Sequence, residues 1–320
     1  MELKPSYLVA LLASLFLAAC DDSEDKVYVD QYPEVSLRIE IPFEAVAGET
    51  AIDCDTTLTG LGTADSSGQI ADFRFFVHNV RLVLENGDEL PVELDETDMQ
   101  TDNIAMLDFR NKLDECSGDE NPNMNKKLVG SITLGEGVTG TVTGLAFTLG
   151  VPASHNHADQ ALANGPLKNP GIASGMAWSW QMGYKFTGLD MLVDGGITTS
   201  GSGMGMSMSG SSSKWSIHLG STGCTGDPTI GETVSCTYPN RSEISLDGFV
   251  IGNSKVQLDY AELVSANDLS ADAGGATGCM SGATDPECES LFTKFGLVHA
   301  LSGADPEHPP TQTVFSLVNL

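Results

Sequence analysis

The chain has 320 residues, 41% of them hydrophobic, and its 44 acidic and 15 basic side chains give a formal net charge of −29. That balance excludes a nucleic-acid-binding protein, because contacts to phosphate backbones require a basic surface. The length suits one β-rich domain, and the acidity favours solubility and attracts cations or basic partners.

The N-terminus has the pattern of an export signal. A basic residue at position 4 precedes an apolar run that ends in Leu-Ala-Ala-Cys at Cys20, and this run is too short for a membrane span. The ending looks like a lipobox, so we expect a lipoprotein signal peptide over residues 1–19 and lipidation of Cys20, which would anchor the protein to a membrane. An ordinary secretory signal with a chance cysteine is the alternative. The expected location is the periplasm or cell envelope of a Gram-negative bacterium, and Asp21 and Asp22 leave open which membrane holds the anchor.

Residues 20–33 are acidic and poor in large apolar groups, which predicts a flexible tether before a folded domain over 34–320. Strand patterns dominate that domain, and they occur at 35–46, 73–94, 129–134, 139–152, 178–194, 214–220, 242–252 and 254–263. Asn86-Gly87 predicts a hairpin turn within the second of these. Helical pattern is confined to 262–269 and 286–298. We therefore expect a mainly β, antiparallel sandwich or barrel-like single domain with long loops and a few short helices.

A Gly/Ser-rich segment at 195–213 contains Met204, Met206 and Met208. Thioethers are soft ligands that suit Cu(I), so this segment is a candidate copper-binding loop. The alternative is a flexible loop in which the methionines have no role.

Seven cysteines leave six once Cys20 is set aside, and six in an oxidising compartment predict three disulfides. The spacing favours two bridges that close short, turn-rich loops and leaves a third by elimination: Cys224–Cys236, Cys279–Cys288 and Cys54–Cys116.

The sequence lacks the c-type haem, H-E-x-x-H, G-x-S-x-G, Walker and EF-hand patterns. We therefore predict no catalytic residues, and an enzyme using a histidine-bound metal ranks last. Neutral imidazole is the commonest transition-metal ligand, which makes four of the six histidines candidate metal ligands: His78, His155, His157 and His218. Each taken singly fits a structural or surface histidine better. The other two, in a Gly/Pro-rich tail, are set aside.

The segment MAWSWQMGYKF, residues 176–186, contains two of the three tryptophans. On one strand, Trp178, Trp180, Met182 and Tyr184 would share a face. Composition favours a core-facing stripe, and the alternative is an indole platform that an oxidising partner can reach.

Several motifs occur in an order that resembles the MbnP-like proteins, also called metallo-mystery pair, four-Cys-motif proteins. They are FRFFVHNVRLV, LGVPASHNHAD, PLKNPGIASGMAWSWQMGYKFTGLD, IHLGSTGCTG, CTYPNRSEISLDGF, VQLDYAELV and CMSGATDPEC. The resemblance covers residues 35 to 318, nearly the whole chain after the tether.

The resemblance implies an exported copper-binding protein whose companion is a dihaem protein of the MauG/cytochrome c peroxidase type. That companion would oxidise a tryptophan, Trp178 or Trp180, to kynurenine, and histidines would hold the copper. Carried over by motif, the ligands would be His157 and His218, with His78 or His155 open as a third. The protein would then be substrate and not catalyst. The alternative is a structural or interaction lipoprotein of the cell envelope without a metal.

Overall fold

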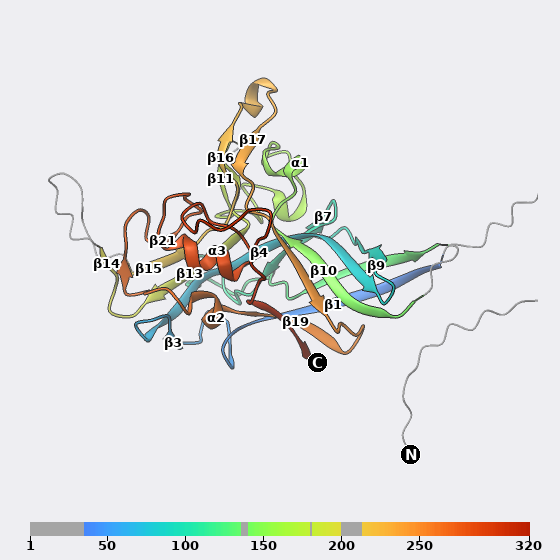
Figure 1. The fold of residues 1–320 in the computed structure, drawn as a ribbon, viewed down its shortest axis with the longest axis horizontal. Helices are drawn as coiled ribbons and strands as arrows, with labels where there is room; N and C mark the ends of the chain where they lie inside the picture. Colours follow the sequence, from blue (N-terminus) through green and yellow to red (C-terminus); the bar gives the residue numbers. More distant parts are fainter. Residues whose placement is uncertain (1–34, 136–139, 180, 200–212) are drawn as a thin grey trace, which may run out of the picture. The chain divides into compact units, whose positions relative to one another are not determined.

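The computed structural model describes residues 35–135, 140–179, 181–199 and 213–320 (Figure 1). The predicted signal peptide and tether, Cys20, Trp180 and the three loop methionines lie outside these residues. Within the described part of the chain, no helix combines the length and apolar character that crossing a membrane requires.

The smaller of two main sheets has the strand order β22-β19-β1-β9-β6, with β2 paired to the end of β1. Its strands are β1 (Val35–Ala47), β2 (Thr50–Ala51), β6 (Glu93–Leu94), β9 (Lys127–Leu134), β19 (Ser254–Asp259) and β22 (Phe315–Asn319). β1 runs antiparallel to β9 but parallel to β19. The predicted opening strand is therefore present. The sheet contains a parallel pairing in addition to the predicted antiparallel pairings.

The larger sheet has the order β18-β10-β4-β13-β15-β21; β3, β5 and β8 also pair with β4, and β7 pairs with β8. Its strands are β3 (Leu58–Leu61), β4 (Ser66–Leu84), β5 (Glu89–Pro91), β7 (Gln100–Thr101), β8 (Ile104–Asp108), β10 (Val142–Leu149), β13 (Thr187–Val193), β15 (Lys214–Ile217), β18 (Ser242–Asp247) and β21 (Gly278–Cys279). β4 and β5 pair antiparallel on either side of Asn86-Gly87, which confirms the predicted hairpin.

Phenylalanine rings join the two sheets. Phe43 on β1 lies 6.3 Å from Phe75 on β4 and 5.7 Å from Phe147 on β10, measured between ring centroids. Phe315 on β22 lies 5.9 and 5.4 Å from the same two rings. Because side chains alternate between faces of a strand, one face of each sheet supplies this core. The fold is the sandwich form of the predicted mainly β architecture.

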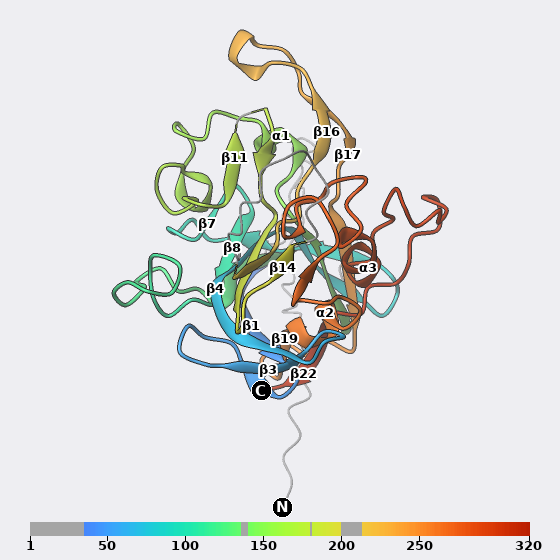
Figure 2. The same cartoon turned by 90° about the vertical axis from the view of Figure 1, so that its left-hand side faces the viewer.

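Short elements complete the domain. They are the ribbons β11 (Ala177–Ser179) with β12 (Gly183–Tyr184), β14 (Thr198–Thr199) with β20 (Ala271–Asp272) and β16 (Thr222–Thr225) with β17 (Ser235–Tyr238), the helices α1 (Ala153–Asn156), α2 (Tyr260–Val264) and α3 (Cys288–Lys294), and the 3-10 turns η1 (Gly165–Leu167) and η2 (Pro228–Ile230). The β16–β17 hairpin projects from the sandwich, with α1 and β11 near its base (Figures 1 and 2). α3 lies within the predicted stretch 286–298, whereas α2 begins before the stretch 262–269 and overlaps only its first three residues.

The predicted strand over 178–194 is wrong, because it is interrupted. β11 and β12 form a hairpin in which Ala177 faces Tyr184, and Gly183 has a φ of +78°, a left-handed conformation that favours glycine. The predicted one-sided stripe therefore does not form. Tyr184 is 1% exposed and Met182 is 40% exposed.

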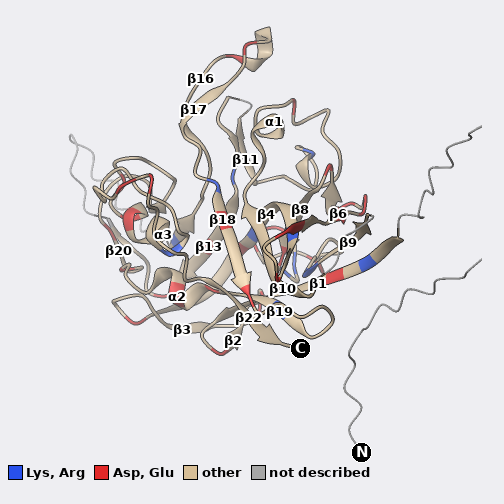
Figure 3. Ribbon diagram, turned by 45° about the vertical axis from the view of Figure 1, so that its right-hand side comes forward, with Lys and Arg blue, Asp and Glu red and all other residues tan. Residues whose placement is uncertain are grey.

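Three disulfides confirm the two pairs that the spacing favoured and the one left by elimination: Cys224–Cys236, Cys279–Cys288 and Cys54–Cys116. The first links β16 to β17, and the second links β21 to α3. Acidic residues, red in Figure 3, occur on β1, α2 and α3 among other elements, so the negative charge is not confined to one element.

Candidate functional site

The segment Gly183–Thr187 lies at the centre of the candidate site, because it touches the elements that carry both motif histidines. Phe186 donates its backbone N–H to the carbonyl of Leu219 (2.6 Å), and the Thr187 hydroxyl donates to the carbonyl of Ile217 (3.0 Å). This segment therefore lies beside the residues around His218.

The indole of Trp178 packs against Gly220, two residues after His218. A Cβ built on Gly220 would lie 2.5 and 2.7 Å from two indole carbons of Trp178 and 2.9 Å from the carbonyl oxygen of Tyr184. Only a residue without a side chain fits there, so Gly220 lets the indole pack two residues away from His218. Trp178 itself is half-buried.

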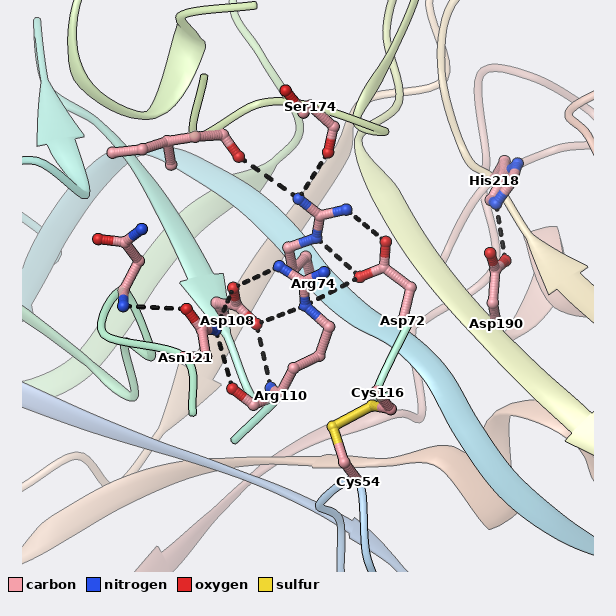
Figure 4. Close-up of polar contacts among 12 residues, drawn as sticks. Cys54, Asp72, Arg74, Asp108, Arg110, Cys116, Asn121, Ser174, Asp190 and His218 are labelled. Atoms are coloured by element: carbon pink, nitrogen blue, oxygen red, sulfur yellow. Dashed lines mark hydrogen bonds and ion pairs between the residues drawn. A yellow bond between two sulfur atoms is a disulfide. The ribbon is translucent and has the colours of Figure 1, made fainter. Parts of the chain in front are cut away.

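His218 is buried and is oriented by a carboxylate (Figure 4). Its Nε2 lies 2.7 Å from Oδ1 of Asp190, which comes from the middle of the neighbouring strand β13. Burial disfavours the Asp190 carboxylate, but hydrogen bonds from His218 and Ser216 outweigh burial and hold the pKa of Asp190 below its ordinary value. A carboxylate can only accept, so Nε2 carries a proton, and in the tautomer that carries only this proton Nδ1 has the lone pair.

Nδ1 of His218 is buried and has no hydrogen-bond partner among the described residues. A buried polar atom without a partner costs about 1–3 kcal/mol, so its retention needs an explanation. A histidine whose one nitrogen is held by a carboxylate while the other is free is the usual arrangement of a metal-ligating imidazole.

His157 follows α1 directly and lies against the disulfide of the projecting hairpin. Its Nε2 is 3.3 Å from Sγ of Cys236 and 3.0 Å from Nδ2 of Asn156. The Oδ1 of the fully buried Asn156 accepts the backbone N–H of Tyr184 (3.0 Å). Asn156 thus ties His157 to the central segment that also lies beside His218.

The described residues contain one compact group of three potential metal-binding atoms, from His157, Cys224 and Cys236. Its two sulfur atoms are joined in a disulfide, so they are not thiolates, the form of cysteine that binds metals. His157 is therefore the one effective ligand of this group. The four candidate histidines do not form such a group with one another in the described part of the chain.

His78 and His155 lie near each other. His78 is half-buried on β4, with Nδ1 2.8 Å from the carbonyl oxygen of Gly150, and burial lowers its pKa. The charge of His155 acts on His78 in the same direction. His155 has its Nδ1 2.9 Å from the Ser154 hydroxyl and its Nε2 3.6 Å from Oδ2 of Asp102. His78 therefore has Nε2 available, whereas both nitrogens of His155 have partners.

A charged pocket of about 400 Å³ adjoins His218 and Asp190. Arg74 bonds Asp72 and the carbonyl of Ser174, and Arg110 bonds Asp108 (Figure 4). Lys185 also lines the pocket, and burial lowers its pKa.

Asp190 is the functional candidate that sequence reasoning missed. The sequence signal was weak, because Asp190 alternates with Leu189, Met191 and Val193 as a polar residue of the opposite face would, and its burial is seen only in the structure. A charged side chain in such a strand requires a partner, and His218 supplies it.

Fold and site together define a disulfide-linked β-sandwich protein in which the segment Gly183–Thr187 lies beside the elements that carry two motif histidines and the indole of Trp178. Comparison with known proteins agrees. The chain belongs to the MbnP family, whose family model matches residues 36–281. The solved structure of MbnP from Methylosinus trichosporium is similar at 29% identity and a TM-score of 0.75, over 89% of this chain and 99% of that one. No curated protein sequence matches the chain.

Proposed function

We propose that this protein binds copper through His218 and His157. The observation that carries the proposal is the buried Nδ1 of His218, which meets no hydrogen-bond partner among the described residues, on a ring oriented by the Asp190 hydrogen bond. Imidazole nitrogen suits copper, which binds such donors most tightly among the divalent first-row metals. Membership of the MbnP family supports the same conclusion.

The ligand set needs a further donor, because the two histidines do not form a compact three-atom group with another candidate in the described residues. Trp178 packs on Gly220, two residues from His218, but an indole offers no useful donor. Kynurenine would supply a ketone oxygen and an aniline nitrogen there.

We infer that a dihaem partner of the MauG/cytochrome c peroxidase type carries out this modification with peroxide as oxidant. Two peroxide molecules oxidise the indole ring across its C2–C3 bond, giving N-formylkynurenine and two waters. Hydrolysis then releases formate and leaves kynurenine, a net gain of one oxygen and loss of one carbon. The half-buried position of Trp178 suits oxidation by electron transfer to a docked partner. The present protein would be the substrate of that reaction.

The expected setting is the periplasmic side of a membrane, with lipidated Cys20 as anchor and residues 20–33 as tether. The alternative of a metal-free structural or interaction lipoprotein remains, and it makes an opposite prediction for metal content.

Copper content decides between the two. We would measure copper per chain by elemental analysis, before and after treatment with partner and peroxide, in the wild type, His218→Ala and His157→Ala. The matched control is His308→Ala, because that side chain is exposed and contacts only Asp305 among the interactions described. The proposal predicts copper loss in the first two variants only. Equal copper content in all four proteins, or none in the treated wild type, would favour the metal-free alternative.

Peptide mass spectrometry of the treated protein tests the modification separately. The expected result is the kynurenine mass on Trp178. The same mass on Trp180 would move the proposed donor to that residue, and unmodified tryptophans would remove the partner reaction.

A further inference from the structure

The segment that leads into α3 contains three acidic side chains that are more than nine-tenths buried: Asp272, Asp285 and Glu287. The Cys279–Cys288 disulfide fixes this segment to the helix. Buried carboxylates are normally paired with a basic group or a metal ion, so Asp285 and Glu287 raise the question of what balances them.

Two of the acids face each other. The carboxyl groups of Asp285 and Glu287 lie within hydrogen-bond distance of one another. Oε1 of Glu287 accepts the backbone N–H of Ala273, but its Oε2 is buried and meets no donor among the described residues. Two ionised carboxylates are both acceptors, so something positive must lie between them.

The described part of the chain places no lysine or arginine in an ion pair with either Asp285 or Glu287. The lysine that lines the adjoining pocket, Lys294, bonds Glu262 instead (2.6 Å). Burial raises the pKa of both acids, and the neighbouring carboxyl of Asp285 adds to the effect on Glu287, whose pKa reaches about 7.

Glu287 lines a pocket of about 650 Å³, and Asp285 directly precedes Pro286 and Glu287 of its wall. The other acidic residues on its wall are Asp268, Asp272 and Glu289. The pocket therefore has an excess of oxygen donors and negative charge, whereas the nearby His299 is engaged through Nε2 with the carbonyl oxygen of Gly282 (2.8 Å). Such a donor set suits a hard cation and not a transition metal.

We propose that Asp285 and Glu287 bind one Ca²⁺ ion beside this pocket, with water completing its coordination. Ca²⁺ takes six to eight oxygen ligands in irregular geometry, whereas Mg²⁺ demands a near-ideal octahedron. The ion would stabilise the segment that contains Cys279, whose carbonyl accepts the backbone N–H of His218 (2.8 Å). The Ca²⁺ site is distinct from the proposed copper site and does not depend on it.

Calorimetric titration of the chelator-treated, disulfide-intact protein with CaCl₂ tests the proposal. We expect saturable binding of one Ca²⁺ per chain and a Tm that rises with Ca²⁺ concentration. Glu287→Gln should weaken Ca²⁺ binding at least about tenfold, since loss even of a residue that only supports a ligand costs 10- to 100-fold. The matched control is Glu289→Gln, which removes the same charge from an exposed residue of the same pocket and should bind as the wild type does.

The competing explanation is that Asp285 and Glu287 share one proton and bind no cation. The variant Glu287→Gln distinguishes the two explanations. The amide of Glu287→Gln donates a hydrogen bond to Asp285, as a shared proton would. A wild-type protein without saturable Ca²⁺ binding overturns the proposal, and a raised Tm of Glu287→Gln at pH 8 would then identify the proton. Should Glu287→Gln not fold, Asp285→Asn and the wild-type titration still decide. Copper content reads out the other site independently.

Discussion

The hydrogen bond between Asp190 and His218 provides a sharp test of the site, because both side chains are buried and the bond is short (2.7 Å). Asp190→Asn removes the charge but keeps an acceptor in place. Hydrogen bonds to charged groups contribute about 1.5–3 kcal/mol, and neutral ones about 0.5–1.5 kcal/mol. The variant should therefore lower the free energy of unfolding by about 1 kcal/mol.

Asp190→Ala removes the acceptor altogether and leaves both ring nitrogens of His218 without a partner. A buried unsatisfied donor adds about 1–3 kcal/mol to the loss of the bond, so we expect a total of about 3 kcal/mol. The matched control is Asp194→Asn, an exposed residue near the end of the same strand, which should stay within about 0.5 kcal/mol of the wild type.

Urea unfolding followed by fluorescence measures these differences, and a copper titration of the folded variants measures the second consequence. Because Asp190 fixes the proton on Nε2 and the orientation of the ring, Asp190→Asn should weaken copper binding about 10- to 100-fold. An Asp190→Asn variant as stable as Asp194→Asn, with wild-type copper affinity, would refute the argument that Asp190 positions His218.

Three further predictions follow from particular contacts. Gly220→Ala forces the indole of Trp178 to move, so it should cost about 1–3 kcal/mol of stability and shift the tryptophan fluorescence. The control is Gly135→Ala, because a Cβ there meets open space. Identical fluorescence spectra and stability of the two variants would contradict the packing of Trp178 on Gly220. Replacing Cys224 and Cys236 with serine opens a loop with a sequence separation of 12, which should lower the free energy of unfolding by about 3 kcal/mol. The change should also loosen the contact that supports His157, so unchanged copper binding would show that the β16–β17 hairpin does not position His157. In chelator, the raised pKa of Glu287 means that the folded protein binds more protons than the unfolded one between the ordinary value of 4.5 and about 7. Stability should therefore fall as pH rises through that window, and Ca²⁺ or Glu287→Gln should flatten the dependence; a rise in stability would have the wrong sign.

Local patterns predicted the parts of the fold that local forces determine. The Asn86-Gly87 hairpin and α3, which ends before Gly296 with its φ of +77°, depend on residues close in sequence. Two of the disulfides close short loops, so spacing sufficed for them. The parallel pairing of β1 with β19 joins strands about two hundred residues apart, and no periodicity contains that information.

The W-x-W segment shows why the site was only partly predictable. Alternation assumes a continuous strand, but Gly183 adopts a positive φ and the chain reverses between β11 and β12. Motif resemblance selected His157 and His218, while the contacts that hold them emerged only once distant segments were placed together: Asn156 links His157 to Tyr184, and Asp190 bonds His218. Asp285 and Glu287 suggested nothing beyond a helix start until their burial was known.

Copper-edge anomalous diffraction from crystals of the partner-treated, copper-loaded protein would test the central claim most directly. The account predicts one peak at bonding distance from Nδ1 of His218, about 2.0 Å by analogy with zinc–histidine bonds, with Nε2 still held by Asp190 and the residue at position 178 beside the metal. A copper peak elsewhere, or a His218 ring that still shows an unoccupied Nδ1 in the loaded protein, would contradict it.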